Sequence, residues 1–220
     1  DGLSKNTLDS YRFDLTLFSS WLSKDVNIDL IHVSQSEIQQ YLAHKFPTSQ
    51  ARSISRLLAT LRRFYRYLLR EKKVSYDPTL QIQTPKTPKS LPKSLSEEDV
   101  ESLLNAPTLN SPTGLRDRAM LELLYACGLR VSELVGILLT EVIVTDGIIR
   151  VTGKGSKTRL VPMGEEAVDW VLQYIANARQ DILKKKTSKF LFITARGGAM
   201  TRQAFWYLIK KYALIANINK

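Results

Sequence analysis

The chain has 220 residues, and its 32 Lys and Arg against 21 Asp and Glu give a net charge of +11. This length allows one large or two modest domains. The positive excess favours a polyanionic partner, because cations placed against phosphates release condensed counterions, although charge alone is equally consistent with a merely soluble basic protein.

The single cysteine, Cys127, excludes an internal disulfide and a zinc site built on cysteines, and it fits the reducing environment of the cytoplasm. No apolar run approaches the roughly 20 residues that a membrane-spanning helix needs, so we expect no membrane partner. The N-terminal residues show no signal-peptide pattern. They also do not begin with Met, and we expect further residues upstream of Asp1.

Residues 1–83 predict an all-helical domain. A first helix follows Ser4, a residue type that caps helices, and apolar residues recur at helical spacing as far as Leu22. A second helix is expected over 36–46, before Pro47, and a third over 49–71. The aromatic residues of the third helix, Phe64, Tyr65 and Tyr67, are expected in the core.

The third helix predicts a DNA-binding face. Four of its arginines form a narrow arc opposite its apolar side, namely Arg52, Arg56, Arg63 and Arg70. Arg66 lies beside this arc. Such a row can follow a phosphate backbone. The alternative is an ordinary solvated face, but 52–73 holds eight cations against the single acid Glu71.

Residues 84–94 contain three prolines and three lysines, which predicts an extended linker between domains. A second domain is expected over 95–220, with Ser96 capping its first helix. Its further helices are predicted over 115–127, ending at Gly128, then over 131–138, 165–183 and from Thr201 to about 215. Strands are predicted over 141–144, 148–152 and 158–161, with a hairpin turn at 146–147, and 190–193 is a strand or buried turn.

Arg130 is the first candidate for chemistry, because it follows a helix-ending glycine and a guanidinium can bind two phosphate oxygens at once. Glu133 lies one helical turn further and could orient that fork. The alternative is a structural Arg–Glu pair that pins two helices.

Lys154 is the second candidate, because Gly153 and Gly155 allow a tight turn and close approach to a ligand. A lysine at a hairpin tip can protonate a leaving oxygen, and the alternative is an exposed turn lysine. The spacing of the glycines and the residue after the lysine exclude a nucleotide-binding loop of the Walker A type. The two histidines, His32 and His44, both lie in the first domain and are expected to be surface or packing residues.

Six blocks of sequence then point to a family. They occur in the order 6–15, 117–126, 128–134, 150–155, 160–168 and 200–206, and include Gly128-Leu-Arg-Val-Ser-Glu-Leu134 and Arg150-Val-Thr-Gly-Lys-Gly155. In these blocks the whole chain resembles the bacterial Xer tyrosine recombinases of the phage integrase family.

The resemblance implies an all-α N-terminal core-binding domain of SAM-like fold and a mixed α+β catalytic domain with a small antiparallel sheet. It implies DNA strand exchange through a 3′-phosphotyrosyl intermediate, with no metal and no cofactor. Arg130 matches the first catalytic arginine of the family, Lys154 matches the hairpin lysine that acts as general acid, and Glu133 matches the acid that supports the arginine. Arg202, in the last block, is also expected to bind DNA.

The partners implied are a double-stranded recombination site, a related Xer recombinase in a heterotetramer, and a DNA translocase as activator. The role implied is resolution of chromosome dimers at cell division. Two alternatives stay open, a mobile-element integrase of the same family and a non-catalytic DNA-binding fragment.

The chain departs from the family at its end. The family continues with a His-x-x-Arg block, a further His or Trp, and the nucleophilic tyrosine, whereas this sequence stops at Lys220, about where that block should begin. Tyr207 and Tyr212 precede that position, so neither is expected to be the nucleophile. We expect the C-terminal part of the catalytic domain to lie beyond Lys220.

Overall fold

The computed structural model describes residues 2–85, 94–153, 155 and 157–219. The chain divides into two compact units, Asp1–Leu91 and Pro92–Lys220. Lys154 and residues 86–93 of the predicted linker lie outside the described residues.

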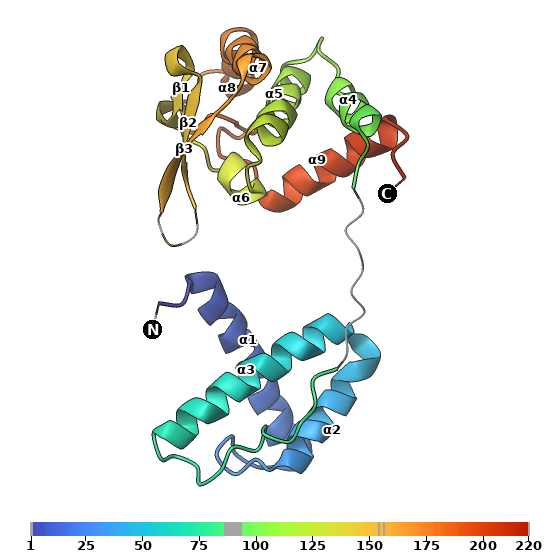
Figure 1. Cartoon of the computed structure of the whole chain (residues 1–220), viewed down its shortest axis with the longest axis vertical. Helices are drawn as coiled ribbons and strands as arrows, with labels where there is room; N and C mark the ends of the chain where they lie inside the picture. The colour runs from blue at the N-terminus through green and yellow to red at the C-terminus, as the bar shows by residue number, and fades with distance from the viewer. Residues whose placement is uncertain (1, 86–93, 154, 156, 220) are drawn as a thin grey trace. The chain divides into compact units, whose positions relative to one another are not determined.

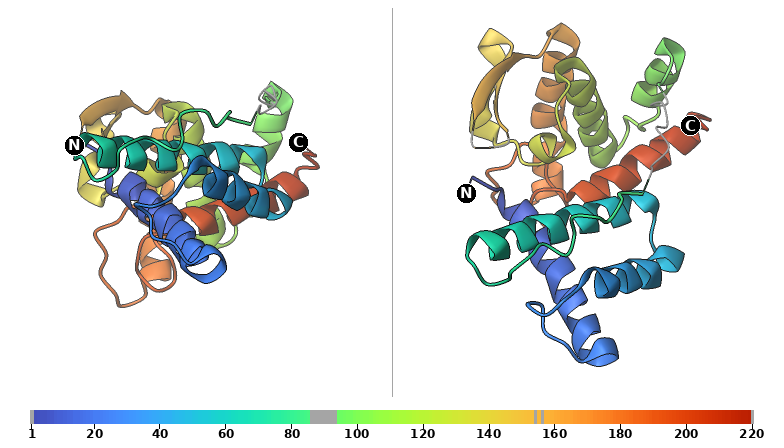
Figure 2. Two further views of the ribbon diagram at one scale, coloured as in Figure 1. Left: turned by 90° about the horizontal axis from the view of Figure 1, so that it is seen from below. Right: turned by 60° about the horizontal axis from the view of Figure 1, so that its bottom comes forward.

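The first unit consists of three helices, α1 (Lys5–Trp21), α2 (Gln35–Lys45) and α3 (Ala51–Arg70). A π-helical turn, Leu22–Val26, follows α1, and a 3-10 turn, Phe46–Thr48, precedes α3. Helices α1 and α3 cross each other (Figures 1 and 2). The predicted helices are confirmed, and so is the cap at Ser4, whose hydroxyl accepts the backbone N–H of Thr7.

The core of the first unit is apolar and aromatic. Tyr65 of α3 is fully buried and donates its hydroxyl to the carbonyl of Leu30 at 2.9 Å. The expectation that Tyr67 lies in the core is wrong, because 51% of it is exposed on the arginine side of α3. After α3 the chain returns along the helix, where Arg62 donates to the carbonyl of Ile82 and to the hydroxyl of Thr84.

The second unit contains six helices and a small sheet among its described residues. The helices are α4 (Glu97–Asn105), α5 (Pro112–Cys127), α6 (Val131–Leu134), α7 (Glu165–Asn177), α8 (Arg179–Leu183) and α9 (Arg202–Ile215). The strands are β1 (Val142–Ile143), β2 (Ile148–Thr152) and β3 (Thr158–Pro162), antiparallel in the order β1-β2-β3. The sheet lies beside α5 and α7, which pack together (Figure 1).

Three predicted elements differ in the second unit. The predicted helix over 165–183 is two helices, because the backbone at Ala178 leaves the helical region. The turn at 146–147 is a longer connection, since a 3-10 turn, Val144–Asp146, precedes Gly147 with its positive φ of 62°. Helix α6 ends at Leu134 rather than at 138, and a 3-10 turn, Leu139–Glu141, follows instead.

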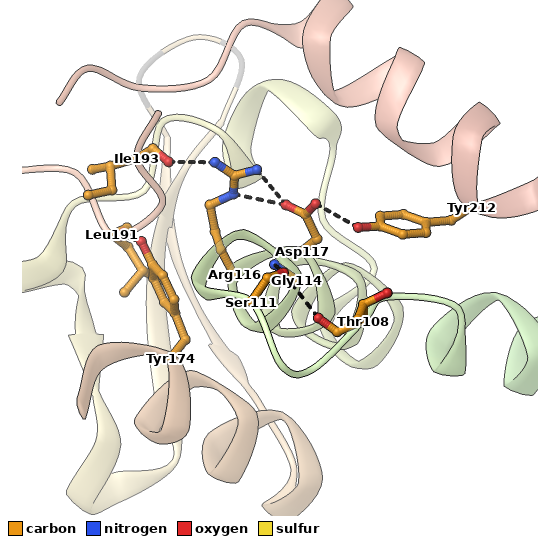
Figure 3. A network of polar contacts seen from close by, with 9 residues as sticks. All are labelled: Thr108, Ser111, Gly114, Arg116, Asp117, Tyr174, Leu191, Ile193 and Tyr212. Carbon is orange, nitrogen blue, oxygen red and sulfur yellow. Dashed lines mark hydrogen bonds and ion pairs between the residues drawn. The ribbon is translucent and has the colours of Figure 1, made fainter. Parts of the chain in front are cut away.

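A buried polar network fixes α5 within the second unit (Figure 3). The guanidinium of Arg116 donates to the carboxylate of Asp117 at 2.7 and 2.8 Å and to the carbonyl of Ile193 at 2.9 Å. The hydroxyl of Tyr212, on α9, donates to the other oxygen of Asp117 at 2.8 Å. Burial raises the pKa of Asp117, and the hydrogen bonds to its charged form oppose that shift. The network therefore joins α5 to α9 and holds the helix that leads into Arg130.

Candidate functional site

Arg130 stands at a junction between two helices. Helix α5 ends at Gly128, whose φ of 55° is the left-handed conformation that glycine adopts at least cost. The chain reverses there, and Arg130 becomes the residue that caps α6. Its side chain is 68% exposed, so the guanidinium presents its outer edge to solvent.

Glu133 is the buried anion of the site, with only 3% of its side chain exposed. Its Oε1 accepts from Nη1 of Arg130 at 3.0 Å and from Nη1 of Arg159 at 2.9 Å. Its Oε2 accepts from the backbone N–H of Arg130 at 2.8 Å and from Nη2 of Arg159 at 2.9 Å. These hydrogen bonds, first of all those from Arg159, lower the pKa of Glu133 to about 2 against the opposing effect of burial. The carboxylate is thus ionised at neutral pH.

Arg159, on β3, was not among the residues that the sequence singled out. The structure brings it to Glu133 across 26 positions of sequence. The three side chains carry a net charge of +1, and the exposed part of that charge lies on the two guanidinium groups, since Glu133 is buried. Such an arrangement can hold an oxyanion in a fixed orientation.

The β2–β3 hairpin lies against this ion cluster. A Cβ atom added at Gly153 would lie 3.2 Å from both Nη1 of Arg159 and Oε1 of Glu133, and 3.7 Å from Nη1 of Arg130. Only glycine therefore allows the hairpin to approach the cluster without displacing a side chain. The backbone N–H of Gly153 donates to the carbonyl of Lys157 at 2.9 Å, just beyond the last residue of β2.

A second positively charged surface lies in the first unit. It is a groove along α3, which we call the α3 groove, lined by Tyr11, Ala59, Arg62, Arg63, Arg66, Tyr67 and Arg70. The guanidinium of Arg70 lies 5.4 Å from the ring centre of Tyr67, within the range of a cation–π contact.

The four arginines predicted on α3 do not share one environment. Arg63 and Arg70 line the α3 groove, and Arg52 is exposed near the start of the helix. Arg56 instead donates from both terminal nitrogens to the carboxylate of Asp14 on α1, at 2.8 Å each. Asp14 also accepts the hydroxyl of Thr60, so Arg56 links two helices while half of its side chain stays exposed.

Arg202 is exposed at the first position of α9, where Thr201 caps the helix by accepting the N–H of Ala204. Helix α9 begins beside α6, and the two helices contact each other (Figure 1). Arg202 therefore starts a helix that is a direct neighbour of the helix headed by Arg130.

The described residues include no group of three His, Cys, Asp or Glu side chains that could hold a metal ion. None of the described helices is both long and apolar enough to cross a bilayer. The two histidines lie in the first unit, and His44 packs against the ring of Trp21.

The helical unit and the α+β unit each expose arginines, the side chains best suited to binding phosphate. Comparison with known families gives the class of protein. Residues 93–220 match the phage integrase family, and residues 1–72 match the SAM-like N-terminal domain of phage integrases. The chain belongs to the phage integrase family.

Within that family the sequence blocks favour the XerD branch, and the relatives confirm it. The tyrosine recombinase XerD of Pseudomonas putida is 52% identical over 220 residues, which are 100% of this chain and 74% of that protein. The XerD of Proteus mirabilis is 50% identical over 219 residues, 99% of this chain and 70% of that protein. The chain is thus a homologue of the XerD tyrosine recombinases.

A solved structure supports the fold independently of sequence. The XerH site-specific recombinase, bound to a palindromic difH substrate in a post-cleavage complex, superposes with a TM-score of 0.76 at 18% identity. The match covers 96% of this chain and 63% of that one. The predicted fold class, a helical SAM-like domain followed by a catalytic domain with a small antiparallel sheet, is confirmed.

Proposed function

We propose that this protein recombines DNA at a specific site and resolves chromosome dimers at cell division, acting in the cytoplasm with a related recombinase. The observation that carries the chemistry is Arg130, an exposed guanidinium held on a buried carboxylate beside the β2–β3 hairpin. The XerD homology over the whole chain supports the biological role.

In the proposed reaction a tyrosine hydroxyl gives up its proton to water, and its oxygen attacks the scissile phosphorus to form a 3′-phosphotyrosyl ester. The bond from phosphorus to the 5′ oxygen breaks, and that oxygen leaves with a proton as a 5′-hydroxyl. Arg130 binds the non-bridging oxygens, where negative charge builds up in the transition state. Lys154 donates the proton to the leaving oxygen, a role assigned from its place in the motif between Gly153 and Gly155.

None of the described tyrosines is assigned as the nucleophile of this reaction. The chain spans 70–74% of the length of these two XerD relatives. Tyr212 is engaged elsewhere, since its hydroxyl donates to the buried Asp117.

DNA binding is proposed to use both units, residues 1–83 as the core-binding domain and 95–220 as the catalytic domain, joined by a linker over 84–94. In the first unit the α3 groove offers Arg63, Arg66 and Arg70 to the phosphate backbone. Arg52 and Arg202 are exposed and add contacts, while Arg56 serves mainly to hold α3 on α1.

The proposed assembly is a heterotetramer of two copies of this protein and two of a related recombinase on one double-stranded site, with a DNA translocase as activator. A structural relative supports the DNA partner, since XerH is bound to a palindromic difH substrate.

Covalent trapping tests the proposal. Full-length protein would be mixed with a nicked suicide substrate, in which the released strand end diffuses away, and the products separated on a denaturing gel. The wild-type protein should give a covalent protein–DNA band, and Arg130→Ala should abolish that band while DNA binding on a native gel remains. Arg196→Gln, which removes one exposed arginine from a turn of the same unit, is the matched control and should trap as the wild type does. Intact binding without any covalent band from the wild type, with its partner recombinase present, would refute the catalytic role.

A further inference from the structure

Arg159 reaches the site because of strand register. It pairs with Val151 across the β2–β3 ladder, and cross-strand partners in an antiparallel pair share one face of the sheet. Val151 is 2% exposed, so this face is the one turned toward the core. The side chain of Arg159 thus starts from the core-facing side of the sheet, near the end of the hairpin. There it contacts Glu133 rather than the apolar core.

The carboxylate of Glu133 is filled by its four donors, two on each oxygen. A carboxylate oxygen accepts about two hydrogen bonds, so Glu133 has no remaining capacity for a second side-chain hydrogen bond from Arg130. Arg130 therefore gives one side-chain N–H to Glu133. Among the described residues no acceptor engages its Nε or Nη2.

We propose that Arg159 is a positioning residue for phosphoryl transfer: by holding both oxygens of Glu133, it leaves most of the Arg130 guanidinium available to a phosphate. This inference rests on the proposed function of Arg130. Without Arg159 the buried carboxylate loses two of its four donors. An under-compensated buried charge then draws the guanidinium of Arg130 into a two-pronged ion pair, which is the same geometry that a phosphate requires.

The same contact joins the hairpin to the start of α6. Arg159 belongs to β3 and Glu133 to α6, and a Cβ atom added at Gly153 would lie 3.2 Å from both side chains. The ion cluster therefore fixes the end of the hairpin against the helix that carries Arg130. Loss of Arg159 is expected to loosen the site. The overall fold should tolerate the loss, because 40% of the Arg159 side chain is exposed and the residue is not part of the core.

A double-mutant cycle on full-length protein tests this role, read as the single-turnover rate on the nicked suicide substrate. Arg159→Gln should lower the rate by roughly 10- to 100-fold, the loss expected when a reacting group is misplaced by about 1 Å. Half-site affinity should stay within about threefold. Once Glu133→Gln has removed the buried charge, adding Arg159→Gln should cost less than about threefold more.

Two further readouts separate positioning from simple structural support. Arg159→Lys should recover only part of the rate, because an ammonium cannot hold both carboxylate oxygens as the guanidinium fork does. In the Arg159→Gln variant the pKa of Glu133 should rise from about 2, so the acid limb of the rate profile should move to higher pH. The other charged groups near Glu133 are Arg130, beside the carboxylate, and Glu141 and Arg150, which border the hollow next to it. They are present in both the wild-type protein and the Arg159→Gln variant, so they do not account for a difference between the two pH–rate profiles.

Specific results would overturn the inference. Additive losses in the cycle would show that Arg159 acts independently of Glu133. A half-site affinity that falls with Arg159→Gln, together with a salt dependence reduced by about 0.9 in slope, would show that Arg159 itself contacts a phosphate. Absence of trapping by the wild-type protein would remove the proposed function, and this role with it. Arg196→Gln again serves as the charge-matched control.

Discussion

Arg56→Gln and Arg63→Gln remove the same charge from the same helix, yet the structure predicts opposite consequences. Arg56 is bonded through two nitrogens to the buried Asp14, whereas Arg63 lines the α3 groove. We expect Arg56→Gln to destabilise the first unit with little effect on DNA binding. Arg63→Gln should weaken DNA binding with little effect on stability.

The sizes follow from these environments. Breaking a buried ion pair costs about 3–5 kcal/mol, and because half of the Arg56 side chain is exposed we expect about 1–3 kcal/mol for Arg56→Gln. The hydroxyl of Thr60 stays as a donor to Asp14 and limits the loss. Arg63→Gln should change stability by less than about 0.5 kcal/mol, but it should lower the slope of log affinity against log salt by about 0.9, the value of one phosphate contact.

Two measurements on the 220-residue chain check this pair. Fluorescence anisotropy of a labelled half-site duplex, taken between about 50 and 200 mM salt, gives the slope. Hydrogen exchange of α1 and α3 under mild urea gives the local free energy of opening. A different result would refute this reasoning: Arg56→Gln would lower the salt slope as much as Arg63→Gln and leave hydrogen exchange unchanged. Arg56 would then bind DNA as Arg63 does, and its ion pair with Asp14 would not stabilise the first unit.

Three other substitutions follow from the second unit. Gly114→Ala should destabilise it by roughly 1–3 kcal/mol, read as a lower Tm, because the new Cβ would lie 1.9 Å from the backbone carbonyl oxygen of Thr108. Tyr212→Phe should lower the free energy of unfolding by about 1–3 kcal/mol, because Oδ2 of the buried Asp117 loses the hydrogen bond from the tyrosine hydroxyl (Figure 3). Urea denaturation measures this loss, and an unchanged midpoint would count against the network. Glu133→Gln should flatten the acid side of the stability profile. The folded pKa is about 2 against an ordinary 4.5, so the stability due to ionised Glu133 is fully present above pH 4.5 and is lost as the pH falls toward 2.

Helix starts were predicted well from the sequence because their signals are local. Ser4, Ser96 and Thr201 each accept a backbone N–H within the first turn of the helix they begin, as their residue type indicates. The break between α7 and α8 was not predicted. Ala178 carries no helix-breaking chemistry, and what holds the second helix is tertiary: Arg179 donates to the backbone carbonyls of Ser188, Phe190 and Leu191. Contacts of that kind leave no mark on local sequence.

The same distinction explains why the sequence revealed two members of the ion cluster and missed the third. Arg130 and Glu133 are three positions apart at a helix start, so helical geometry alone places them together. Arg159 joins them only through the hairpin, and its role depends on which residue faces Val151. A signal was nevertheless present. Pairing 148–152 with 158–162 puts a charged side chain on the face that carries Ile149 and Val151, and a charge on a core face needs a buried partner. Glu133 is an acid already expected to support Arg130, so register analysis of the hairpin points to Arg159 and leaves Glu133 as a candidate partner.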